Sequence, residues 1–134
     1  MSIEDKNKDY KSLRKAIGTK ANHKDLAETC VCFANAQGGE IIIGIEDNHD
    51  APPSNQRINQ EDINSLLKSL RSLTDGVGIV NQETVTHDNG GEYFILKILP
   101  STRVIATTTS GKVFIRVSDN CFPVSSEELT QLAS

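Results

Sequence analysis

Aromatic residues are scarce in this sequence. It has no tryptophan, two tyrosines and four phenylalanines, so aromatic residues make up 4% of the chain. Proteins that hold single-stranded nucleic acid stack its bases on aromatic side chains, and this composition offers few such platforms. Long apolar runs are also missing, because none approaches the roughly 20 residues that cross a bilayer. The N-terminus, MSIEDKNKDYK, lacks the apolar centre of a secretion signal. We therefore expect a cytoplasmic protein that does not associate with membranes.

Cysteine is sparse as well, with three residues in the chain. Cys30 and Cys32 are too close in sequence for an ordinary bridge across a helix, and an odd number leaves one thiol over. We expect all three to be reduced. A structural zinc site needs about four ligands, and Cys30 and Cys32 would point about 200° apart around a helix. The three histidines restore no zinc-site spacing, so we predict no zinc.

Familiar nucleotide and nucleophile motifs are absent too. GGEIIIG at positions 38–44 follows a helical pattern and precedes a strand, whereas a phosphate loop follows a strand and opens a helix. No serine or cysteine lies in a G-x-S-x-G setting. We predict no ATP site in this chain.

The charge is distributed unevenly. The chain has a formal net charge of −4, yet residues 1–24 alone have a net charge of +4, which leaves −8 on the remainder. Such a basic segment would hold an anionic partner at one place, because exposed charges are screened beyond about 8 Å at physiological salt. A solvated basic arm is the simpler alternative. The basic residues are Lys6, Lys8, Lys11, Arg14, Lys15, Lys20 and Lys24.

The pattern of apolar residues predicts one α+β (mixed α/β) domain over residues 1–134, in which a mixed, mostly antiparallel sheet packs with two main helices and a short C-terminal helix. One helix begins after Asn22 and ends at Gly38-Gly39, and the second begins after Asn59. The short helix opens with Ser125 and Glu128. The predicted strands are 40–45, 79–87, 92–99, 103–109 and 112–117, and the three consecutive isoleucines of the first indicate a strand buried on both faces.

Carboxylates are the remaining chemical candidates. Glu4 and Asp9 lie in the N-terminal segment, and Glu46 and Asp47 follow the strand at 40–45. Acids at a strand end emerge into solvent, where their oxygens can bind a hard cation such as Mg²⁺ or Mn²⁺. The alternative is that these acids merely end a strand.

The stretch FANAQGGEIIIGIED at positions 33–47 resembles the signature of the Schlafen/AlbA-type DNA-binding domain, which reads A-F-A-N-T-x-G-G, then apolar residues, then G-V-D-D. Asp9-Tyr10-Lys11 lies where that family has Glu-Phe-Lys, and VFIRVS at 113–118 resembles its Y-I-R-V-G-S. The resemblance covers nearly the whole chain. It implies an α/β domain found in transcription regulators and in proteins related to RecG-like ATP-dependent DNA helicases.

Three functions follow from the resemblance and the charge pattern. The first is DNA or RNA binding, with phosphate contacts from Lys6, Lys8, Lys11, Arg14, Lys15 and Arg116. The second is a divalent-metal-dependent endoribonuclease of Schlafen type, in which Glu4, Asp9 and Asp47 would be the catalytic acids and the metal ligands. The third is a regulatory or oligomerisation domain, as a homodimer or beside a further C-terminal domain.

We expect binding rather than catalysis in this chain alone. Asp9 stands where the family has Glu, and the missing methylene retracts the carboxylate by roughly 1.5 Å. Metal sites tolerate only about 0.2 Å in ligand distance.

Overall fold

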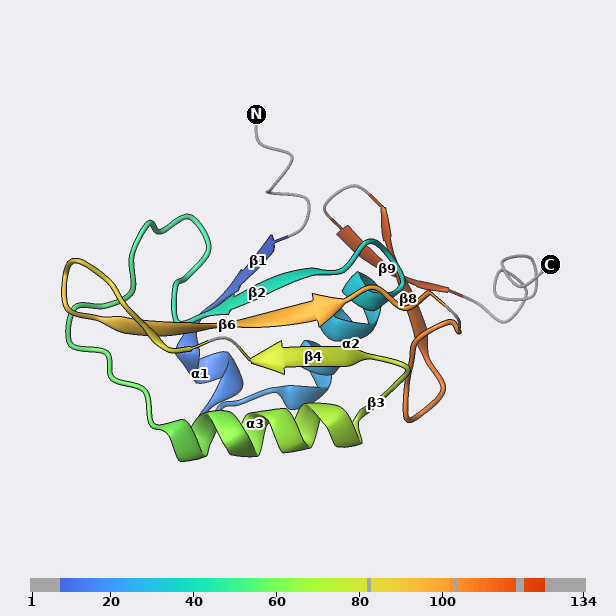
Figure 1. Cartoon of the computed structure of the whole chain (residues 1–134), viewed down its shortest axis with the longest axis horizontal. Helices are drawn as coiled ribbons and strands as arrows, with labels where there is room; N and C mark the ends of the chain where they lie inside the picture. The colour runs from blue at the N-terminus through green and yellow to red at the C-terminus, as the bar shows by residue number, and fades with distance from the viewer. Residues whose placement is uncertain (1–7, 82, 103, 118–119, 125–134) are drawn as a thin grey trace.

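A computed structural model describes residues 8–81, 83–102, 104–117 and 120–124 (Figure 1). The last helix expected from Ser125 lies outside the described residues. The elements in chain order are β1 (Lys8–Lys11), α1 (Leu13–Ala16), α2 (His23–Ala34), β2 (Gly39–Ile43), α3 (Gln60–Ser72), β3 (Thr74–Asp75), β4 (Gly78–Asn81), β5 (Val85–Thr86), β6 (Glu92–Leu99), β7 (Thr107–Thr108), β8 (Val113–Val117) and β9 (Asn120–Val124). The predicted α+β class is confirmed.

The main sheet has the strand order β1-β2-β6-β4, and β5 pairs with the far part of β6. β1 runs parallel to β2, while β2, β4 and β5 run antiparallel to β6. The triple isoleucine of β2 is buried, as the sequence predicted: Ile41 and Ile43 join the core, and Ile42 on the opposite face is 5% exposed. Two short ribbons, β3-β7 and β8-β9, complete the sheet structure at the other end of the molecule.

Both main helices begin where the sequence places them. The Asn22 side chain accepts a hydrogen bond of 3.1 Å from the Asp25 backbone N–H, and Asn59 accepts one of 2.9 Å from that of Glu61. Helix α2 ends at Ala34, before the predicted position, and Gly38, whose φ of +78° is left-handed, then reverses the chain into β2. The apolar stripe of α3 is buried against the sheet.

The helices cover one face of the sheet, and the opposite face carries a different set of side chains. In β6, Phe94, Leu96 and Ile98 are at most 1% exposed and join the core, together with Phe33 of α2 and Ile41 of β2. The residues between them, at positions 93, 95 and 97, point to the other face, as alternation in a strand requires. In Figure 1, α1 and α2 lie behind the sheet and α3 runs along its lower edge.

Several sequence predictions of elements were wrong. The expected strand 79–87 is two strands, β4 and β5, and the expected strand 103–109 is reduced to the two residues of β7. The N-terminal segment holds β1 and α1, and β9 follows β8; none of these was predicted. β1 forms because its backbone pairs with that of β2. This is a long-range pairing, and a polar sequence of four residues does not predict it.

The expectation of three reduced cysteines was also wrong. Cys32 of α2 forms a disulfide with Cys121 of β9, at a Cα–Cα distance of 5.9 Å and a sequence separation of 89 residues. Sequence spacing could not reveal this pair, because the two residues meet only when the β8-β9 hairpin packs beside α2. Cys30 is the free thiol, and its burial raises its pKa to about 12.

No helix in the described part of the chain is both long enough and apolar enough to cross a bilayer.

Candidate nucleic-acid interface

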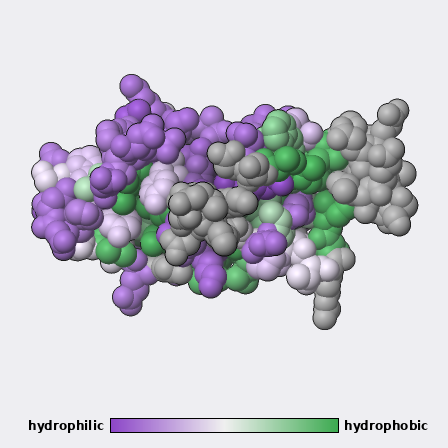
Figure 2. Space-filling view, turned by 90° about the horizontal axis from the view of Figure 1, so that it is seen from above, coloured by the Kyte–Doolittle hydropathy of each residue, from purple (hydrophilic) through white to green (hydrophobic). Residues whose placement is uncertain are grey.

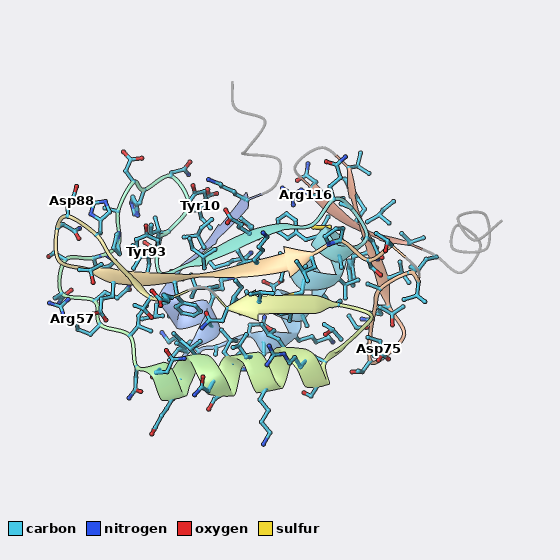
Figure 3. The ribbon with its side chains drawn as sticks, viewed as in Figure 1. Tyr10, Arg57, Asp75, Asp88, Tyr93 and Arg116 are labelled. Carbon is cyan, nitrogen blue, oxygen red and sulfur yellow. A yellow bond between two sulfur atoms is a disulfide. The ribbon has the colours of Figure 1, made fainter. Side chains whose placement is uncertain are left out.

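The uncovered face of the main sheet carries two rows of side chains, and we call it the open face. One row joins Lys8, Glu40 and Lys97, which stand in register on β1, β2 and β6. The next row joins Tyr10, Ile42 and Ile95 on the same strands, and Tyr93 lies two residues further along β6. The face therefore combines two lysines, two tyrosines and an aliphatic floor of Ile42, which is buried, and Ile95, which is partly buried. Figure 3 shows Tyr10 and Tyr93 toward the same end of the sheet.

Two hollows indent the open face. One has a volume of about 290 Å³, and its lining includes Tyr10, Tyr93, Ile42 and Ile95. The other has a volume of about 380 Å³, and its lining includes Lys97. Lys8 and Glu40 line both, so the two hollows adjoin along the row of charges.

On the other side of β1, the alternating residues engage α2. The Nζ of Lys11 lies 3.4 Å from a carboxylate oxygen of Asp9 and 3.9 Å from one of Asp25. Lys11 is therefore held between two acids, although the sequence analysis placed it among the phosphate contacts. Asp9 and Lys11, which were both expected in the site, thus form an ion pair with each other on the helix side of β1.

Arg14 and Lys15 lie on α1. The guanidinium of Arg14 is 3.1 Å from a carboxylate oxygen of Glu46, whose other oxygen lies 3.6 Å from Nδ1 of His49. Arg14 and Glu46 line a separate hollow of about 420 Å³ between α1 and the loop after β2. Lys15 is exposed. Lys6 lies outside the described residues.

Arg116 of β8 is set apart from the other basic candidates. Its guanidinium carbon lies 4.5 Å from the centroid of the Phe33 ring, and one of its nitrogens is 3.9 Å from Sγ of Cys121. This stacking on a buried ring ties the β8-β9 hairpin to α2. The contacts of Arg116 therefore indicate a role in packing the hairpin against α2.

The three acids expected from the resemblance are only partly described. Glu4 lies outside the described residues, Asp9 is paired with Lys11, and Asp47 is exposed in the loop after β2. Within residues 8–81, 83–102, 104–117 and 120–124, no group of three or more His, Cys, Asp or Glu side chains is arranged to hold a metal ion. The three-acid site stays a prediction.

The most recognisable stretch of the sequence has a structural role that sequence reasoning missed. The Asn35 side chain donates hydrogen bonds to the carbonyls of Ala106 and Phe114 at 2.9 and 3.0 Å, and accepts one of 2.7 Å from the Ala106 N–H. Asn35 thus fastens the end of α2 to two segments more than 70 residues away in sequence. An asparagine just after a buried helix was the available signal.

The two glycines of this stretch are also structural. A Cβ on Gly38 would lie 2.5 Å from the carbonyl oxygen of Ile98, and one on Gly44 would lie 2.8 Å from Nε2 of Gln56. Gly44 has a φ of +115°, and Gln56 donates to its carbonyl at 2.9 Å and to that of Glu92 at 2.8 Å. The loop after β2 is therefore anchored to β6, which fixes one end of the open face.

The comparisons with known proteins support the fold and the family. The solved structure of the DIP2311 protein from Corynebacterium diphtheriae is similar to this chain, with a TM-score of 0.63 and 23% sequence identity over 98% of the chain. That level of identity supports the fold alone. The chain spans 27% of the length of DIP2311. No curated protein matches the chain.

A family comparison covers most of the sequence. The family described as Schlafen, AlbA_2 matches residues 4–125, which include β1, the Asn35 stretch and β8. The match confirms the resemblance seen in the sequence and supports a nucleic-acid-related domain. The chain belongs to the Schlafen AlbA_2 family.

Proposed function

We propose that this domain binds nucleic acid through lysine contacts to the phosphate backbone. The observation that carries the proposal is the open face, where Lys8 and Lys97 flank Glu40 on a sheet surface that no helix of the described residues covers. Membership of the family supports the same function. Lys15, exposed on α1, adds a further basic side chain near the N-terminal strand.

The ion pairs of the domain refine the list of contacts. Lys11 and Arg14 are compensated by neighbouring acids, and Arg116 stacks on Phe33, so these residues contribute less to phosphate binding than Lys8, Lys15 and Lys97. The acidic remainder of the chain repels a polyanion. Binding is therefore confined to the basic surface and depends strongly on salt.

Fluorescence anisotropy with labelled DNA and RNA tests the proposal. We expect affinity to fall steeply between about 50 and 200 mM salt, with a log–log slope of about −0.9 per duplex phosphate neutralised. Lys8→Gln and Lys15→Gln should each reduce the magnitude of the slope by about one unit, and Lys68→Gln on α3 is the matched control that should not. No binding to any probe at low salt would overturn the proposal.

DIP2311 is a longer chain that contains a similar fold, and this suggests the setting of the domain. We propose that it serves as the DNA-binding part of a larger transcription regulator or helicase-related protein, or of a homodimer. Light scattering at several protein concentrations tests the homodimer, because a constitutive dimer keeps twice the monomer mass throughout.

A further inference from the structure

We propose that the open face selects single-stranded nucleic acid, with bases stacked on Tyr10 and Tyr93 and the backbone held by Lys8 and Lys97. This inference rests on the proposed function and names the class of nucleic acid that the same surface takes.

The placement of the tyrosines carries the inference. The chain has only two tyrosines, and both lie on the open face, on the strands that flank β2. Both side chains are partly exposed, and within the described part of the chain neither hydroxyl has a hydrogen-bond partner. All four phenylalanines are elsewhere, and Phe33 and Phe94 are fully buried in the core. On the main sheet, the aromatic side chains exposed to water are therefore the two tyrosines, which carry hydroxyl groups.

The spacing of the tyrosines suits two bases. β1 and β6 are separated by β2, and Tyr93 lies two residues along β6 from the row of Tyr10, so the two tyrosines stand about 12 Å apart. Ile42 and Ile95 lie between them and form an apolar floor to the 290 Å³ hollow. Unstacked bases have apolar faces and polar edges, which match a floor of this kind flanked by aromatic rings.

The balance of charge differs between the two hollows of the open face. The hollow that contains the tyrosines is lined by two acids, Glu40 and Asp50, together with Lys8 and His49. The two acids repel phosphate but can accept hydrogen bonds from exocyclic amino groups. The adjoining hollow is lined by Lys8 and Lys97 with Glu40 as its one acid. A strand that lays its bases on the tyrosines would thus run its backbone along the lysines.

A duplex cannot use this arrangement. Its bases are stacked on one another, so their faces are closed to Tyr10 and Tyr93, and only phosphates and groove edges are offered. A single strand can turn its bases outward onto the rings, and base–aromatic stacking is largely independent of sequence. The open face should therefore bind single strands more tightly than duplexes of the same sequence.

The test measures the affinity of each variant for single-stranded and duplex probes. The variants distinguish the effect of the aromatic ring from that of side-chain size. Tyr10→Leu and Tyr93→Leu keep an apolar side chain but remove the aromatic face, whereas Tyr10→Phe and Tyr93→Phe keep that face. We expect each leucine variant to bind single strands roughly 5- to 100-fold more weakly, and each phenylalanine variant to bind as the wild type does. Circular dichroism confirms that each variant is folded before it is used.

The outcomes separate this inference from the function on which it rests. Equal affinity for single strands and duplexes, with leucine variants unchanged, would overturn the inference and leave nucleic-acid binding intact. Lack of binding to every probe at low salt would overturn both. Loss of single-strand binding in the leucine variants, with duplex binding unchanged, supports the inference.

Discussion

The two faces of the main sheet differ in burial and in chemistry, although their residues alternate along the same strands. On the helix side, Phe94, Leu96 and Ile98 are sealed in the core, and Asp9 is paired with Lys11. On the open side, Tyr93, Ile95 and Lys97 of the same strand line hollows. Figure 2 shows hydrophilic residues over the left of the molecule seen from above, whereas apolar residues gather right of centre.

The comparison shows that most of the recognisable stretch at 33–47 builds the scaffold, although Glu40 and Ile42 of that stretch lie on the open face. Asn35, Gly38 and Gly44, in the stretch that identifies the family, all serve backbone geometry and long-range hydrogen bonds. Lys97, by contrast, belongs to no motif recognised in the sequence, and it lies on the open face with Tyr10. The family stretch therefore mainly builds the scaffold, and the groups that could meet a ligand come from β1, β2 and β6 together.

The largest expected effect comes from neighbouring residues on opposite faces. Phe94→Ala should lower the free energy of unfolding by about 3–5 kcal/mol, because a fully buried ring leaves a cavity. Tyr93→Leu, one residue away on the open face, should lower it by less than about 1.5 kcal/mol. Urea denaturation followed by circular dichroism measures both. Similar losses for the two variants would show that the open face is as closely packed as the core.

Reduction of the disulfide should have the next largest effect, again on the helix side. The bond between Cys32 and Cys121 closes a long loop, so its loss should lower the free energy of unfolding by about 2–4 kcal/mol. Urea denaturation with and without a thiol reductant measures the change, and Cys121→Ser is the control that should not respond to reductant. A wild type insensitive to reductant would mean that the bond does not form in solution.

The glycines provide a sharper comparison of local strain. Gly38→Ala should cost about 2 kcal/mol or more, because the left-handed φ is combined with a Cβ 2.5 Å from the Ile98 carbonyl oxygen. Gly111→Ala is the matched control, with a φ of +89° and nothing within 4 Å of its Cβ, and should cost about 1 kcal/mol. Thermal unfolding of both variants tests this order, and equal shifts in Tm would contradict it.

The smallest effect at neutral pH concerns Cys30, because it appears only as pH rises above 9.0. The pKa of Cys30 is raised by burial from 9.0 to about 12, so the unfolded chain releases the thiol proton first. The contribution of Cys30 to stability is therefore complete below pH 9.0 and declines as pH rises toward 12. The decline is at most about 1.4 kcal/mol per pH unit. Cys30→Ala should lack this component, and a wild type and variant with parallel pH profiles above pH 9 would contradict it.

Much of the scaffold could be predicted because its signals are local. The caps at Asn22 and Asn59, the glycine reversal at Gly38 and the apolar stripe of α3 each depend on residues close in sequence. The rest depends on distant partners. The parallel pairing of β1 with β2, the Cys32–Cys121 bond and the hydrogen bonds of Asn35 exist only once segments far apart have met.

The candidate site was less predictable for the same reason. Lys8 was expected among the phosphate contacts, but Tyr10, Tyr93 and Lys97 come together only through the order β1-β2-β6. The low aromatic content also argued against an aromatic interface, because composition gives the number of aromatic rings but not which of them are exposed. For the proposed interface, the position of the two tyrosines matters more than the small number of aromatic residues in the chain.

Amide chemical shifts during titration with a short single-stranded oligonucleotide test the central claim most directly. The account predicts the largest shifts at β1, at Glu40–Ile42 of β2 and at Tyr93–Lys97 of β6, with little change in α3. Shifts confined to α1 and the start of α2, or to the β8-β9 hairpin, would contradict it.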